Sequence, residues 1–427
     1  MNVNRTQAPT VHDAIDFEYF LPDINATVLD NGIPLYWLNA GVQDVVEVDW
    51  AFPAGIWYEA NPGAANAVAA LLKNGTSTLS AHQINEALEF YGASLKVNTG
   101  NDFSTLSLHC LCKHLPSVLP IVFQLLTDAV FPESELQIFK TNAIQRLSVN
   151  LKQCEFVANQ RIDALLFGED HPYGRFTKKE VLENLQREML VVHYNRQYAL
   201  LNAKIFMAGH VGQEQVNLVN KLFGSFKTAP VLSTLPNYNI PPFNLQKEHI
   251  VNDNEGVQGA IRIGSIFPNR HHPHYAPMVV LNTLFGGYFG SRLMSNIRED
   301  KGYTYGIYSS ITPYVNSGSL IIQTEAGRDV LEAAVNEVYF EMEKLCTEDI
   351  SQDELLLVKN YLLGNLLGDL DGPFSILQRW RTLIMIGFTK EHFTNNIHIY
   401  KTVTPAQLKQ LAGHYYVKSR FHEVVVV

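Results

Sequence analysis

The sequence has few cysteines, a deficit of positive charge and no long hydrophobic run. Four cysteines in 427 residues are too few for a disulfide-stapled fold, and none of them forms a Cys-x-x-Cys pair. Asp and Glu (42) outnumber Lys and Arg (32), so the net charge of −10 repels phosphate backbones and anionic lipids. We therefore expect neither a nucleic-acid partner nor a membrane partner.

Residues 1–10 also lack the basic segment and apolar core of a secretory signal. No apolar stretch approaches the roughly 20 residues that span a bilayer. We expect a soluble, cytoplasmic protein. At about 100–200 residues per domain, a chain of this length with 46% hydrophobic residues predicts two to four domains with sizeable cores.

Two halves of the chain repeat one pattern of predicted elements. Each begins with an apolar strand that ends at a Phe-Pro pair, followed by two helices, two alternating strands and a further helical region. The elements of the first half are expected over residues 45–52, 64–73, 81–91, 93–97, 104–110 and 115–152, with a break at Pro132. Those of the second half are expected over residues 260–267, 276–285, 291–299, 303–312, 319–324, 328–345 and 353–367.

The segment between the halves is rich in proline. Residues 229–247 hold four prolines and show no helical periodicity, which is typical of a linker. We predict an N-terminal domain over residues 1–228, this linker, and a C-terminal domain over residues 248–427. The fold class is α+β, with two homologous domains, each a mostly antiparallel sheet flanked by helices that lie on one face.

Three motifs support a family resemblance. They are GAANAVAALLKNGT over residues 63–76, HPYG over residues 171–174 and LFGGYFGSRLMSNIREDKGYTY over residues 284–305. The first resembles the zinc-binding helix of the insulinase/pitrilysin-type peptidases, the family that includes mitochondrial processing peptidase. The second resembles that family's His-Pro-Tyr-Gly stretch, and the third its glycine loop and the Arg-Glu-x-x-Gly-x-x-Tyr element. The resemblance covers both halves and the linker.

The zinc motif itself is missing from the first segment. His-x-x-Glu-His binds zinc because two histidines four residues apart share one face of a helix, with the glutamate activating the bound water. In this chain the histidine positions are Asn66 and Ala70, and the glutamate position is Ala69. Alanine offers no ligand atom, and a neutral amide is a poor ligand.

The resemblance also implies a third ligand, a glutamate near Leu147. No Asp or Glu occurs between Glu135 and Glu155, so this ligand is absent as well. We expect no metal, no other cofactor and no independent peptidase activity in this chain.

A second part of the family's active site is present. The resemblance implies that a later half supplies an arginine and a tyrosine to hold the substrate backbone, and Arg298 and Tyr305 match that pair. A guanidinium can donate to a peptide carbonyl, and a phenol can hydrogen-bond an oxyanion. Taken alone, Arg298 could be a surface arginine at a helix end, paired with Glu299 or Asp300, and Tyr305 an ordinary strand aromatic. Gly286 and Gly287 of the glycine loop fit substrate contact and a plain turn equally.

The resemblance predicts a non-catalytic subunit that binds the peptide substrate. It would complete the active site of a homologous partner carrying the His-x-x-Glu-His motif and the zinc, as a heterodimer. The alternative is a peptide-binding homodimer or a scaffold protein with no peptidase role. A third hypothesis displaces the metal to Cys110, Cys112 and His114, which strand alternation would place on one side. Three such residues without a fourth ligand are more often core thiols beside a turn.

Overall fold

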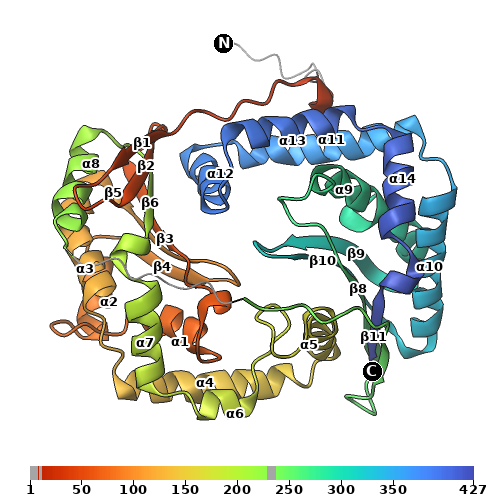
Figure 1. Ribbon diagram of the computed structural model, residues 1–427, viewed down its shortest axis with the longest axis horizontal. Helices are drawn as coiled ribbons and strands as arrows, with labels where there is room; N and C mark the ends of the chain where they lie inside the picture. Colours follow the sequence, from red (N-terminus) through yellow and green to blue (C-terminus); the bar gives the residue numbers. More distant parts are fainter. Residues whose placement is uncertain (1–7, 9–11, 228–236) are drawn as a thin grey trace.

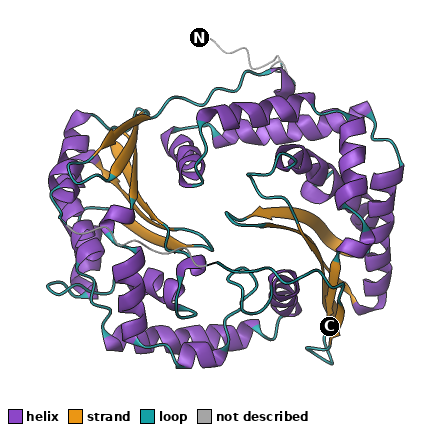
Figure 2. Ribbon diagram, viewed as in Figure 1, coloured by secondary structure: helices purple, strands orange, loops and turns teal. Residues whose placement is uncertain are grey.

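The computed structural model describes residue 8, residues 12–227 and residues 237–427. It contains two domains whose sheets face each other, with most helices on the outer sides (Figures 1 and 2). The N-terminal strands are β1 (Asn25–Val28), β2 (Pro34–Asn39), β3 (Val45–Phe52), β4 (Ser94–Thr99), β5 (Ser104–Leu111) and β6 (Lys204–Gly209). The C-terminal strands are β7 (Lys247–Ile250), β8 (Gln258–Ile266), β9 (Thr304–Pro313), β10 (Gly318–Gly327) and β11 (His422–Val426).

The helices complete the two α+β domains. Those of the N-terminal half are α1 (Ala64–Leu71), α2 (Ala81–Phe90), α3 (Leu115–Thr127), α4 (Glu133–Asn150), α5 (Cys154–Phe167), α6 (Lys179–Glu183), α7 (Arg187–Gln197) and α8 (Gln213–Val219). Those of the C-terminal half are α9 (Tyr275–Asn282), α10 (Leu331–Thr347), α11 (Gln352–Asp369), α12 (Pro373–Met385), α13 (Lys390–Thr402) and α14 (Pro405–Tyr415). The π-helical turns η6 (Thr283–Gly287) and η7 (Met294–Asp300) follow α9.

The two sheets share one topology, which confirms the predicted duplication. Within the described residues their orders are β1-β2-β6-β3-β5-β4 and β7-β11-β8-β10-β9. From β2 onward the two orders correspond strand for strand. In each sheet one neighbouring pair is parallel, β2 with β6 and β7 with β11, and the other pairs are antiparallel.

Strand β3 shows how the sequence pattern determines the two faces of a sheet. Val46, Val48 and Trp50 are fully buried in the core of the N-terminal domain. Because successive side chains on a strand point to opposite faces, Glu47 and Asp49 lie on the other face, toward the C-terminal half. The alternation of apolar and acidic residues thus separates the domain core from the inner face.

Each inner face is partly covered by a helix from the other domain. Helix α5 of the N-terminal half packs on β8 and β11, and α12 of the C-terminal half packs on β2 and β6. The expectation of helices on one face only is therefore wrong. The physical reason is that parts of the inner faces are apolar, with Phe206 and Ala208 in one sheet and Val424 and Val426 in the other. Burying them removes apolar surface from water.

Buried charges connect these exchanged helices to the sheets. Asp49 on β3 is 0% exposed and accepts a hydrogen bond from Arg381 on α12. In the other sheet Arg262 on β8 is 1% exposed, and its Nε donates to Asn159 Oδ1 on α5 at 2.6 Å. Its Nη2 lies 2.9 Å from Glu325 Oε1. Each domain therefore contributes a polar anchor to the inner face of the other.

Asp163 on α5 predicts a pH dependence of stability. Burial raises the pKa of this carboxyl from 3.8 to about 7, so the folded chain holds the proton more tightly than the unfolded chain. The free energy of unfolding should therefore fall as the pH rises from about 4 to about 7. At about 1.4 kcal/mol per pKa unit, about 2 kcal/mol is lost between roughly pH 5 and pH 7.

Urea unfolding at about pH 5 and about pH 7 should show a smaller loss of the free energy of unfolding for Asp163→Asn than for the parent chain, because the amide does not titrate. The exposed Asp170→Asn serves as a control and should retain the full loss. Equal losses in Asp163→Asn and the parent would contradict the prediction.

Part of the predicted linker lies outside the described residues, namely residues 229–236. Residues 237–246 form neither helix nor strand, and β7 begins at Lys247. The domain boundaries stay a prediction.

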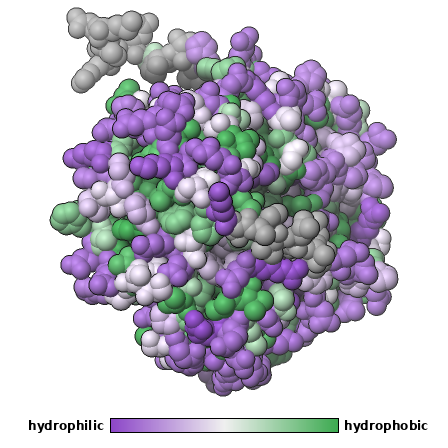
Figure 3. Space-filling view, turned by 60° about the vertical axis from the view of Figure 1, so that its left-hand side comes forward, coloured by the Kyte–Doolittle hydropathy of each residue, from purple (hydrophilic) through white to green (hydrophobic). Residues whose placement is uncertain are grey.

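Among the described helices, none is both long enough and apolar enough to cross a bilayer. On the face shown in Figure 3, hydrophobic residues form several separate areas between hydrophilic ones. Scattered exposure of this kind is normal for a folded protein and does not itself mark a docking surface.

Candidate functional site

Helix α1 carries the positions where the zinc motif would stand. Asn66 and Ala70 are four residues apart and exposed, so they share one accessible side of the helix. Ala69, at the position of the general base, is 7% exposed and packs inward. The accessible side of α1 therefore presents an amide and a methyl group, which do not fit a zinc ion.

The buried carboxylate of Glu59 lies beside α1 and binds the first turn of that helix. Glu59 is 4% exposed, and its Oε2 accepts from the backbone N–H of Ala65 at 3.0 Å. Its Oε1 pairs with Arg175 Nη2 at 2.6 Å. Burial raises the pKa of Glu59, and these two donors oppose the rise. An acidic group at the first turn of a helix stabilises it, so Glu59 serves α1 itself.

The third ligand position gives the same result. Leu147 lies on α4, which packs against α1, and it is 8% exposed. Its isobutyl side chain has no ligand atom. The residues present at all four positions therefore do not fit the zinc of the resembling peptidases.

Arg298 and Tyr305, in contrast, are brought together. Arg298 on η7 donates from Nε to the backbone carbonyl of Tyr305 on β9 at 3.0 Å. Its guanidinium carbon lies 4.6 Å from the centre of the Phe289 ring, and Nη1 lies 3.7 Å from Glu299 Oε1. Tyr305 is 92% exposed. The structure thus holds the arginine in place and leaves the phenol accessible.

A β-bulge explains why Tyr305 projects into solvent. The pairing of β9 with β10 shifts between Thr304 and Ile307, so that Tyr305 and Gly306 stand opposite the single residue Glu325. Bulges re-aim side chains and are frequent next to active sites. Without the shift, Tyr305 would follow the alternation of Ile307 and point into the core. The sequence contains no plain signal for this bulge.

Gly286 and Gly287 end the turn η6, and the structure gives Gly286 a packing role. Gly286 is buried, and a Cβ built on it would lie 2.7 Å from Ser309 Cβ and 2.8 Å from Leu293 Cδ1. Gly287 is partly exposed. Contact of this loop with a substrate stays a prediction.

Gly286→Ala should lower the free energy of unfolding by about 1–3 kcal/mol, because the added methyl group overpacks the contact with β9. Gly368→Ala on α11 is the control, since a Cβ there meets nothing within 4 Å. Its stability should stay level or rise slightly, because alanine is the better helix former. Chemical denaturation measures both, and equal stabilities of the two variants would contradict the close packing.

The structure does not group Cys110, Cys112 and His114. Cys110 is 2% exposed in the domain core, and the His114 ring lies 5.3 Å from the Tyr91 ring. Cys112 turns instead toward the end of β6, where its Sγ lies 3.3 Å from the carbonyl oxygen of His210. The third hypothesis, a metal site at these three residues, is therefore not supported by their placement.

Comparison with known proteins identifies the family of this fold. A model described as "Insulinase (Peptidase family M16)" matches residues 40–171, which include α1. A second model, described as "Peptidase M16 inactive domain", matches residues 184–362, which include Arg298 and Tyr305. The chain belongs to peptidase family M16. The resemblance stated from the motifs is confirmed, and the M16 membership extends over both domains.

Relatives and solved structures agree with M16 membership. The chain is 24% identical to the uncharacterized zinc protease YmxG of Bacillus subtilis, over 71% of this chain and 74% of that protein. It is 26% identical to an uncharacterized zinc protease of Mycobacterium leprae, over 74% of this chain and 72% of that protein. A peptidase M16 inactive domain from Pseudomonas fluorescens has the same fold, with a TM-score of 0.86 at 20% identity, over 95% of this chain and 98% of that one. A protease from Helicobacter pylori gives 0.85 at 16% identity, over 95% and 100%.

Proposed function

We propose that this chain is the non-catalytic subunit of an M16 metallopeptidase. It completes the active site of a homologous partner that carries the His-x-x-Glu-His motif and the zinc. One observation carries the proposal: Arg298 and Tyr305 are held together and accessible, whereas Asn66, Ala69 and Ala70 offer nothing to a metal.

The geometry of the pair suits the recognition of a peptide backbone. A guanidinium has five N–H donors, of which the Tyr305 carbonyl takes one from Arg298. The contact with Phe289 further restricts the arginine, so fewer rotamers are lost when a substrate binds. The Tyr305 phenol is 92% exposed and can donate a hydrogen bond to a developing oxyanion, which is the role that we assign to its hydroxyl.

The position of the pair on the sheet suits an extended substrate. Strand β9 is the last strand in its sheet order, so among the described strands it pairs with β10 alone. An extended peptide can add to such an edge through backbone hydrogen bonds, which recognise sequence only loosely. A peptide on this edge would pass Tyr305 at the start of β9. We therefore expect broad peptide specificity.

The partner in this proposal is a different chain. Two copies of the present chain would bring no zinc ligand at Asn66, Ala70 or Leu147, so a homodimer could capture peptides but would have no M16 zinc site for cleaving them. A heterodimer with an intact homologue supplies both parts of the site. If the two chains do not associate, a peptide-binding homodimer or a scaffold protein is the alternative.

The proposal is tested by co-expressing this chain with the intact-motif homologue most similar to it in the same genome. Each chain alone and the purified mixture are assayed on a fluorogenic peptide. Activity confined to the mixture supports the proposal, and a mixture whose partner lacks the motif glutamate serves as the inactive control. Equal activity of the partner alone, or no association of the two chains, would overturn it.

A further inference from the structure

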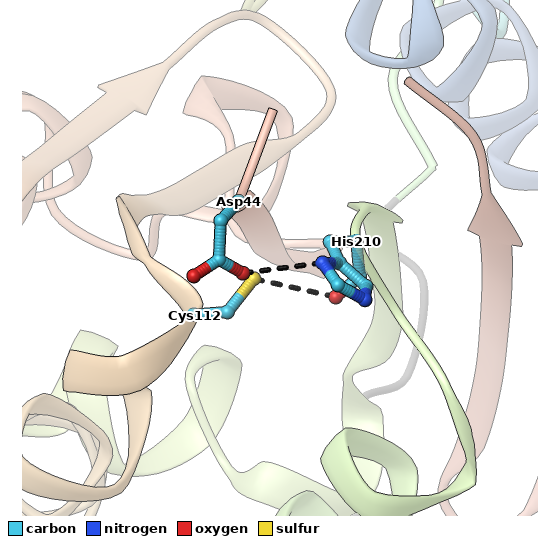
Figure 4. Close-up of side chains that lie close together, drawn as sticks. All are labelled: Asp44, Cys112 and His210. Carbon is cyan, nitrogen blue, oxygen red and sulfur yellow. Dashed lines mark hydrogen bonds and ion pairs between the residues drawn. The ribbon is translucent and has the colours of Figure 1, made fainter. Parts of the chain in front are cut away.

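Three residues with metal-binding side chains meet at one end of the N-terminal sheet. Asp44 directly precedes β3, Cys112 directly follows β5, and His210 directly follows β6 (Figure 4). His210 Nδ1 lies 3.1 Å from Asp44 Oδ1, and one ligand atom of each residue lies within 4.8 Å of the other two. Among the described residues, this is the only group of three such side chains that is close enough to hold a metal ion.

The sheet itself fixes the positions of the three residues. The backbone N–H of Cys112 donates to the Asp44 carbonyl at 3.1 Å, and that of His210 donates to the Val45 carbonyl at 2.9 Å. Gly209 has a φ of +110°, and a Cβ there would lie 2.2 Å from the Val45 carbonyl oxygen. Glycine is therefore required to turn the chain into His210 at this close approach. Three neighbouring strands thus deliver the three side chains from a rigid support, as a binding site needs.

We propose that Asp44, Cys112 and His210 bind one Zn²⁺ ion, with the remaining coordination position open to water. Thiolate, imidazole and carboxylate are the side chains that zinc prefers, and three protein ligands with one open position is a known arrangement. On binding, the thiol proton of Cys112 passes to the solvent and a sulfur–zinc bond takes its place. One thiolate and one carboxylate then neutralise the charge of the ion.

The local geometry permits this coordination with small movements. Bond lengths of about 2.0–2.3 Å in a tetrahedron place the ligand atoms about 3.5 Å apart. The Asp44 and His210 side chains are 58% and 64% exposed, so both can rotate by the small amount needed. None of the three residues lies on α1 or α4. The inference is therefore independent of the proposed peptidase role.

The test uses the full chain, stripped of metal with a chelator and then titrated with Zn²⁺. We expect one zinc per chain by elemental analysis, and Co²⁺ in its place should give the near-ultraviolet band of a thiolate-to-cobalt charge transfer. Cys112→Ser should abolish that band and lower the zinc affinity at least tenfold. Asp44→Asn should also lower the zinc affinity at least tenfold. Cys346→Ser is the matched control, because the Cys346 thiol also contacts a backbone carbonyl, that of Tyr416 at 3.6 Å.

Less than a stoichiometric amount of zinc in the parent chain would overturn the inference, and so would equal affinities of Cys112→Ser and Cys346→Ser. Circular dichroism checks that each variant is folded. Asp44→Asn changes an exposed side chain to its isostere, so it decides the matter if Cys112→Ser does not fold. The metal content is measured on this chain alone, without a peptidase partner or a peptide substrate, so the result does not depend on the proposed function.

Discussion

A Tyr305→Phe variant of this chain is expected to lower the kcat of the assembled peptidase by about 10²–10³-fold, the usual cost of removing one oxyanion donor. The substitution deletes only the hydroxyl of a side chain that is 92% exposed, so the stability of the chain should not change. The loss should fall on kcat more than on KM, because the hydroxyl acts on charge that develops in the transition state. Steady-state kinetics of the mixture with a fluorogenic peptide measures it.

Tyr308→Phe is the matched control for this experiment. Tyr308 lies on the same strand and is 45% exposed, but it stands within the regular ladder, opposite Gln323. Removing its hydroxyl should change kcat less than twofold by this argument. Equal effects of the two variants would show that the hydroxyl of Tyr305 has no special role.

Arg298→Ala tests the other member of the pair. The substitution removes the guanidinium that would donate to the substrate backbone, and it also removes the hydrogen bond to the Tyr305 carbonyl. The activity of the complex should therefore fall. The zinc content of the partner should stay the same, because Arg298 contributes to the substrate side of the site. Loss of zinc from the partner would show that the role assigned to Arg298 is wrong.

The elements that local sequence determines were predicted closely. The apolar segment that ends at a Phe-Pro pair located β3 at residues 45–52, and α4 begins directly after Pro132, as expected. Proline is favourable at the start of a helix, where a backbone N–H has no intrahelical partner, so the beginning of α4 could be predicted from local sequence. The loss of the His-x-x-Glu-His motif from α1 was equally readable, since it depends only on the residue types at Asn66, Ala69 and Ala70.

The remaining features depend on contacts between distant parts of the chain. Helix α12 covers a sheet whose strands lie more than 160 residues earlier, and no local pattern predicts that exchange. Asp44, Cys112 and His210 converge only because β6 joins the sheet beside β3. The bulge at Tyr305 depends on its pairing with β10. Sequence spacing could match Tyr305 to a family position but could not show that its side chain is exposed.

Arg381→Ala is expected to lower the free energy of unfolding by about 3–5 kcal/mol, because it leaves a buried charge without its partner. Asp49 is 0% exposed on β3, and Arg381 reaches it from α12 across the boundary between the domains. Burial raises the pKa of Asp49, and Arg381 opposes the rise. Without the arginine the carboxyl binds a proton more readily, so the loss of stability should be smaller at about pH 5 than at about pH 8.

Arg379→Ala provides the matched control on the same helix. Arg379 pairs with Asp369, whose side chain is 61% exposed, and exposed ion pairs contribute only about 0–1 kcal/mol. The double variant Asp49→Asn with Arg381→Met should recover most of the stability, because it removes both buried charges together. If Arg381→Ala costs no more than Arg379→Ala, the pair does not anchor α12. The exchanged helix would then be held by the apolar contacts of Leu377 and Trp380 with the sheet.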